Sequence, residues 1–120
     1  MPLSQEKCSS CRRGAPKITA AEADQLKPTI SDWTIIEIDS IQRLHRIFKV
    51  VDFLQAITLA GEIGKAAETE GHHPKITVEW GCVQVEWWTH KIKGLHRNDF
   101  IMAAKTDKII KSTELGLDVS

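Results

Sequence analysis

The strongest constraint on the fold is one long helical pattern that ends abruptly. Between residues 53 and 70, apolar and small residues recur at three- and four-residue spacing, which is typical of a helix with one buried face. The residues on this face are Phe53, Ala56, Ile57, Ala60, Gly64 and Ala67. Asp52 and Gln55 form a capping-box pattern at the start, and Gly71 fits the C-terminal exit. Because Pro74 cannot continue a helix, the chain must change direction at residues 71–74.

Strand patterns lie on both sides of this helix. Residues 33–38 and 41–51 are rich in β-branched and aromatic side chains and are separated by Asp39 and Ser40, which predicts a hairpin. Residues 75–80 and 82–89 predict a second hairpin around Gly81. Within the first hairpin, Arg46 stands at an apolar position that the sequence does not explain.

Two further helices complete the pattern. Thr19 and Glu22 form a capping box for a short helix that must stop before Pro28, and a last helix begins with His96 at its cap and Asp99 in its first turn. The order α-β-β-α-β-β-α predicts an α+β fold: a four-stranded antiparallel sheet with helices packed on one face. We predict that residues 1–17 form an N-terminal tail and that residues 18–115 form a single domain.

Composition excludes several classes of function. Lys+Arg and Asp+Glu each number 16 in 120 residues, so the net charge is zero, which argues against a nucleic-acid partner bound through a broad basic face. No apolar run approaches the roughly 20 residues of a membrane span. The N-terminus carries no apolar segment typical of a secretory signal. We therefore expect a cytoplasmic protein without a membrane partner.

The three cysteines do not form a recognisable framework. Cys8 and Cys11 make a CxxC pair in a polar segment, and Cys82 alone cannot complete a zinc ribbon. We interpret the CxxC pair as part of the N-terminal tail, without a chemical role of its own. Partial metal binding or a redox role stays open as an alternative.

The second hairpin predicts a cluster of histidines. His72 and His73 precede its first strand, and His90 ends its second strand. Because these positions are nearly symmetric about Gly81, strand pairing should bring His90 beside the other two.

Two carboxylates should reach the same place. Glu68 stands one turn before the end of the long helix, and Asp99 lies in the first turn of the last helix. Histidines with nearby carboxylates suit general acid and base catalysis, because imidazole titrates near neutral pH. A three-histidine zinc site is an alternative, although adjacent ligands in extended backbone point to opposite sides. Ordinary surface or capping histidines are a third interpretation.

At this point the sequence resembles a known family. The spacing of seven residues resembles the signature of the pterin-4a-carbinolamine dehydratases. These residues are Glu68, His72, His73, Pro74, Trp80, His90 and Asp99. The resemblance implies that His72, His73 and His90 are catalytic and that no metal or cofactor is needed. The implied substrate-binding residues are Glu68, Pro74, Trp80, Trp88, Thr89 and Asp99.

The family's activity defines what we expect of this chain. Its members dehydrate 4a-hydroxytetrahydropterin to quinonoid dihydropterin and water, which recycles the tetrahydropterin cofactor of aromatic amino acid hydroxylases. The resemblance also implies a homodimer or homotetramer. A non-enzymatic alternative on the same fold is a binding, assembly or transcription-cofactor protein. Gly71 and Ile76 differ from animal-type members, so the resemblance does not define which pterin is bound.

Overall fold

An antiparallel sheet forms the centre of the molecule. In a computed structural model of the protein, the described residues are 2–9, 15–112 and 117–118. The sheet contains, in spatial order, β1 (Thr34–Ile38), β2 (Ile41–Val50), β4 (Cys82–Trp87) and β3 (Lys75–Glu79). A two-residue strand, β5 (Leu117–Asp118), pairs with the end of β2 beyond the predicted end of the domain. The predicted four-stranded antiparallel sheet is confirmed.

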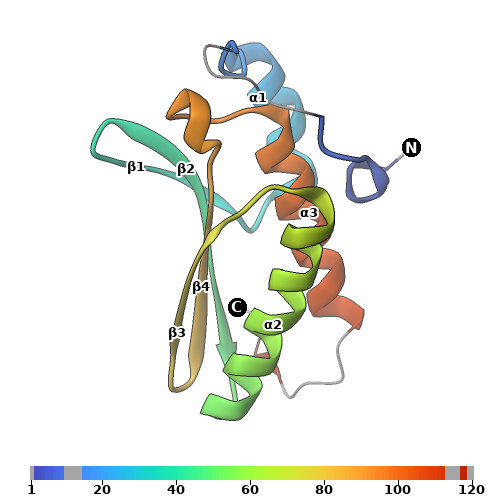
Figure 1. Ribbon diagram of the computed structural model, residues 1–120, viewed down its shortest axis with the longest axis vertical. Coiled ribbons are helices and arrows are strands. Elements are labelled where there is room, and N and C mark those ends of the chain that lie inside the picture. The colour runs from blue at the N-terminus through green and yellow to red at the C-terminus, as the bar shows by residue number, and fades with distance from the viewer. Residues whose placement is uncertain (1, 10–14, 113–116, 119–120) are drawn as a thin grey trace.

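Helices cover one side of this sheet. The α-helices are α1 (Ala20–Leu26), α2 (Phe53–Glu70) and α3 (Arg97–Ser112), and the short 3₁₀-helices are η1 (Leu3–Gln5), η2 (Lys27–Ile30) and η3 (His90–Ile92). Figure 1 shows α2 and α3 on the same side of the strands. The predicted α+β fold is therefore confirmed. Within the described parts of the chain, no helix combines the length and apolar character needed to cross a membrane.

Local sequence signals set the helix ends. The side chain of Thr19 accepts the N–H of Glu22 at the start of α1, and that of Asp52 accepts the N–H of Gln55 at the start of α2. At the end of α2, Gly71 adopts the left-handed conformation with φ of 65°. The N–H of His72 then bonds to the carbonyl of Ala67, which closes the helix before the chain enters β3.

The core lies between the sheet and the two long helices. Alternate residues of β2 and β4 face the helices and are completely buried, among them Leu44, Phe48, Val83, Val85 and Trp87. The buried residues of α2 are Ala56, Leu59, Ile63 and Ala67. The predicted stripe was thus only partly right, since Phe53 and Ile57 are 48% and 47% exposed. Apolar residues occur on both sides of the first turns of α2, and their spacing does not tell which side meets the sheet.

The tertiary structure explains why Arg46 occupies an inward position. Its Nη1 atom lies 2.6 Å from Oδ1 of Asp107 on α3, and its Nη2 atom lies 3.5 Å from Oδ2 of Asp32. The guanidinium also lies over the ring of Phe48, 4.5 Å from its centroid. The buried charge is therefore paired across the interface between sheet and helix.

The N-terminal segment packs on the domain. Leu3 is 9% exposed and belongs to the core, and Nζ of Lys105 donates to the carbonyl of Ser4 at 2.9 Å. Residues 3–9 of the predicted N-terminal tail are therefore anchored to α3. The sequence missed this because the contacts join residues about 100 positions apart. Cys11 lies outside the described residues.

Candidate active site

A cavity of about 520 Å³ opens where the end of α2, η3 and the start of α3 meet. This volume lies within the range of small-molecule binding sites. The residues that line it are Cys8, Ser9, Glu70, Gly71, His72, His73, Thr89, His90, Lys91 and Asn98.

The second hairpin brings the three predicted histidines to this cavity. Lys75 pairs with Glu86 and Glu79 with Cys82, so the strands fold back at the turn formed by Trp80 and Gly81. Residues 72–73 and residues 89–90 consequently lie at the same end of the hairpin. His72, His73 and His90 all line the cavity, as the symmetry about the turn predicted.

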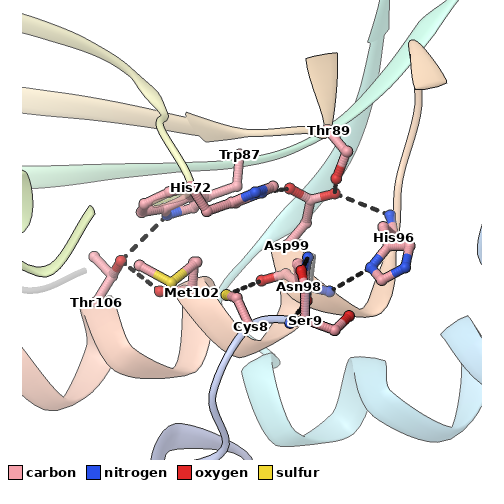
Figure 2. A network of polar contacts seen from close by, with 10 residues as sticks. All are labelled: Cys8, Ser9, His72, Trp87, Thr89, His96, Asn98, Asp99, Met102 and Thr106. Carbon is pink, nitrogen blue, oxygen red and sulfur yellow. Dashed lines mark hydrogen bonds and ion pairs between the residues drawn. The ribbon is translucent and has the colours of Figure 1, made fainter. Parts of the chain in front are cut away.

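Asp99 holds His72 in a buried network (Figure 2). Oδ1 of Asp99 lies 2.6 Å from Nε2 of His72, while Oδ2 accepts the hydroxyl of Thr89 and the N–H of His96, each at 2.9 Å. An ionised carboxylate can only accept hydrogen bonds, so the proton of this contact belongs to Nε2. Nδ1 of the neutral ring is then unprotonated, which is the form of a general base.

Packing fixes the plane of the same imidazole. The ring of His72 stacks on the indole of Trp87 with centroids 5.9 Å apart and an interplanar angle of 11°. Nε1 of Trp87 donates to the hydroxyl of Thr106 at 3.2 Å, and this hydroxyl donates to the carbonyl of Met102 at 2.7 Å (Figure 2). The orientation of His72 is therefore determined by α3 and by β4 together.

His73 has a carboxylate partner of a different kind. Its Nε2 atom lies 2.8 Å from Oε1 of Glu68, and the two side chains are 58% and 79% exposed. Water screens such a pair, so it constrains the ring weakly. The two neighbouring histidines thus differ in burial although they are adjacent in sequence.

His90 rests on a second set of side chains. Its ring lies 4.4 Å from the ring of Trp88, and the guanidinium of Arg43 lies 4.0 Å from the centroid of Trp88. Nη1 of Arg43 also donates to Oε1 of Glu86 at 3.1 Å, and both of these residues are buried. His90 itself is exposed, so its imidazole is accessible to water.

Other predicted residues have different positions. Thr89 lines the cavity. Glu68, Trp88 and Asp99 are not among the lining residues, but they contact His73, His90 and His72, respectively. Trp80 is 77% exposed at the turn between β3 and β4, at the opposite end of the hairpin from His72. Trp80 is therefore not part of the cavity wall formed within one chain, and its role in substrate binding stays a prediction. Pro74 leads into β3 and is not among the lining residues.

The sequence did not indicate several residues of the cavity wall. Lys91 follows His90, Asn98 precedes Asp99, and Glu70 lies two residues from His72, so proximity along the chain was an available signal for these three. Cys8 and Ser9 gave no such signal, because their contacts with Asn98 span 90 and 89 residues. Burial, with the nearby carboxylate of Glu70, raises the pKa of the Cys8 thiol to about 12. Cys8 is therefore a neutral thiol at physiological pH.

The alternative of a metal centre has no geometric support in the described chain. Within residues 2–9, 15–112 and 117–118, no three histidine, cysteine or acidic side chains are arranged to hold a metal ion. Nε2 of His72 is already hydrogen-bonded to Asp99, and Nε2 of His73 is already hydrogen-bonded to Glu68. Imidazole groups that differ in exposure surround one cavity, and this arrangement suits proton transfer.

Comparisons with known proteins place similar sequences in one family. A family model described as pterin 4 alpha carbinolamine dehydratase matches residues 16–109. A relative from Gloeobacter violaceus, named "Putative pterin-4-alpha-carbinolamine dehydratase 1", is 52% identical over 109 residues, covering 91% of this chain and 94% of the relative. A relative from Syntrophotalea carbinolica, named "Putative pterin-4-alpha-carbinolamine dehydratase", is also 52% identical over 109 residues, covering 91% of this chain and 97% of the relative.

A solved structure has the same fold. The crystal structure described as transcriptional coactivator/pterin dehydratase from Brucella melitensis aligns with a TM-score of 0.69 and 26% identity. The alignment covers 78% of this chain and 98% of that chain.

Proposed function

The chain belongs to the pterin 4 alpha carbinolamine dehydratase family of hydro-lyases, and we propose that it dehydrates 4a-hydroxytetrahydropterin by histidine general acid and base catalysis. The observation that carries this proposal is the cavity on which His72, His73 and His90 converge, with Asp99 bonded to His72. The product is quinonoid dihydropterin. Its reduction regenerates the tetrahydropterin used by an aromatic amino acid hydroxylase, which we place with this protein in the cytoplasm.

The reaction requires two proton transfers. The bond between C4a and its hydroxyl oxygen breaks, a ring nitrogen loses its proton, and a carbon–nitrogen double bond forms as water leaves. We assign the removal of the ring proton to His72, because Asp99 stabilises the imidazolium that results. We assign the protonation of the leaving hydroxyl to His90, which is exposed and can regain a proton from water. His73 assists from the same wall of the cavity.

The dehydration rate of a synthetic 4a-hydroxytetrahydropterin, followed by ultraviolet absorbance at neutral pH, tests the proposal. We expect the protein to accelerate the reaction, and His72→Ala or His90→Ala to reduce kcat by about 10²-fold or more. His45→Ala is the matched control, since this histidine lies on β2 and bonds to Gln84, outside the cavity lining. A rate equal to the spontaneous one, from a folded protein, would refute the enzymatic assignment.

A second candidate function is a protein-binding role on the same fold. The Brucella melitensis structure is described as a transcriptional coactivator as well as a pterin dehydratase, so a relative with this fold carries both descriptions. The dehydration assay separates the two candidates, because a binding protein need not retain the proton-transfer network around His72.

Self-association accompanies the proposed function. Val51, Phe53, Leu54 and Ile57 are between 47% and 75% exposed at the start of α2, and β3 is an edge strand of the described sheet. Exposed apolar side chains and an open strand edge favour pairing with a second copy. We propose a homodimer or homotetramer, and a light-scattering mass equal to one chain would contradict it.

A further inference from the structure

Residues 3–9 form a segment that is held along α3, and we call it the N-terminal strap. Leu3 belongs to the core. Glu6 accepts two hydrogen bonds from Arg97 at the start of α3, from Nε to Oε1 at 3.0 Å and from Nη2 to Oε2 at 2.8 Å. This two-point geometry fixes direction as well as distance. The strap is therefore anchored at one end in the core and in its middle by a charged pair.

The far end of the strap is clamped at the rim of the cavity. Oδ1 of Asn98 accepts the N–H of Ser9 at 3.0 Å, and Nδ2 of Asn98 donates to the carbonyl of Ser9 at 2.8 Å (Figure 2). Oε1 of Glu70, the last residue of α2, accepts the N–H of Cys8 at 2.8 Å. The strap thus bridges the two helices whose ends border the cavity.

This clamp also fixes the strap relative to the catalytic group. Asn98 is 2% exposed and directly precedes Asp99, the partner of His72. The same turn of α3 that positions His72 therefore also holds Cys8 and Ser9 in place. A wall with this connection keeps a constant distance from the reacting atoms, whereas an unattached terminus would not.

The part of the cavity wall that the strap supplies is uncharged. The Cys8 thiol is un-ionised, because burial and Glu70 hold its pKa at about 12. One oxygen of the neighbouring Glu70 carboxylate accepts the N–H of Cys8. Two small uncharged side chains therefore complete the cavity, which limits their action on a ligand to shape and hydrogen bonding.

From this geometry we infer that the strap is a fixed wall of the substrate cavity and that Cys8 and Ser9 are specificity-determining residues for the group carried on the pterin ring. The matched family model begins at residue 16, so these two residues lie outside the part of the chain that defines the family. The inference rests on the proposed function, because it assumes that the cavity binds a pterin. It adds that the size of the ring substituent is selected by the strap rather than by the histidines.

The test compares two substrates and two kinds of measurement. Values of kcat/KM are determined for 4a-hydroxytetrahydropterins that carry a methyl or a dihydroxypropyl substituent. Affinities for the corresponding oxidised pterins, which cannot be dehydrated, are determined by quenching of pterin fluorescence. The variants are Ser9→Leu, which fills the wall, and Cys8→Ala, which widens it. Gln5→Leu is the matched control, because Gln5 is an exposed residue of the strap away from the cavity lining.

We expect Ser9→Leu to weaken binding and kcat/KM for the dihydroxypropyl compounds about 10-fold more than for the methyl compounds. Cys8→Ala should shift the preference in the opposite direction, and Gln5→Leu should leave it unchanged. Equal effects on both substrates, from variants with wild-type melting temperatures, overturn the role of the strap while leaving the dehydratase intact. A wild-type protein that does not accelerate dehydration refutes the proposed function. If Ser9→Leu still weakens binding of the oxidised dihydroxypropyl pterin more than that of the methyl pterin, the role of the strap is retained.

Discussion

Nε2 of His72 lies 2.6 Å from Oδ1 of Asp99, and Asp99 is completely buried and accepts two further hydrogen bonds. Asp99→Asn removes the charge that stabilises the His72 imidazolium and leaves only one accepting oxygen. We expect kcat for dehydration to fall about 10²-fold and the melting temperature to fall as well, because the amide NH2 group faces hydrogen-bond donors in a buried site. Steady-state kinetics and a thermal melt measure both quantities. An unchanged kcat would show that Asp99 has a purely structural role.

The neighbouring pair should behave differently. Glu68→Gln removes the partner of His73, but both side chains are more than half exposed. Exposed pairs of this kind contribute about 0–1 kcal/mol, so kcat should change by less than about fivefold. The same assay as for Asp99 provides the measurement. A loss as large as that of Asp99→Asn would show that Glu68 takes part in proton transfer.

The contact between the rings of His90 and Trp88 predicts a positioning effect. Trp88→Leu removes the aromatic surface on which His90 lies, whereas Trp88→Phe keeps one. We expect a loss of about tenfold in kcat/KM for the leucine variant and near-normal values for the phenylalanine variant. Proton NMR supplies an independent readout, because the ring current of Trp88 shifts the His90 ring signals. Normal activity of Trp88→Leu together with altered His90 shifts would contradict the positioning role.

The pair formed by buried Arg46 and half-buried Asp107 predicts an asymmetric effect on stability. Asp107→Ala leaves the guanidinium without its closest partner, and Nε1 of Trp33 loses its acceptor. Urea denaturation should show a loss of about 3 kcal/mol. The double variant Arg46→Met with Asp107→Asn removes both charges and keeps an acceptor for Trp33, so it should be the more stable of the two. Equal stability of these variants would argue that Arg46 is not buried as a charge.

The Cys8 thiol predicts a decline of stability in alkaline solution. Its pKa is about 12 in the folded protein, above the ordinary value of 9.0, so between these values the folded state binds more protons than the unfolded state. Stability attributable to this group is complete below pH 9 and is lost as the pH rises through 12. Denaturation at a series of pH values should show a steeper alkaline decline for the wild type than for Cys8→Ala. Parallel curves would indicate that Cys8 titrates normally in the folded chain.

Much of the fold could be predicted because its signals are local. The caps at Thr19 and Asp52, the exit at Gly71 and the turn at Gly81 each depend on a few consecutive residues, and each lies where the pattern placed it. The same symmetry about Gly81 brought His90 to the cavity of His72. Where apolar residues occupy two sides of a helix, as in the first turns of α2, spacing alone left the buried face undetermined.

What the sequence determined by itself is the order of the elements and the set of histidines and carboxylates at one end of the second hairpin. Tertiary structure alone decided that His72 is buried on Asp99 while His73 stays in water, and that Arg46 is paired across the core. It also decided that Trp80 lies away from the cavity and that Cys8 and Ser9 lie on its wall. The physical reason is that periodicity records which residues share a face, whereas burial and pairing depend on segments that are distant in the chain and meet only when the core forms.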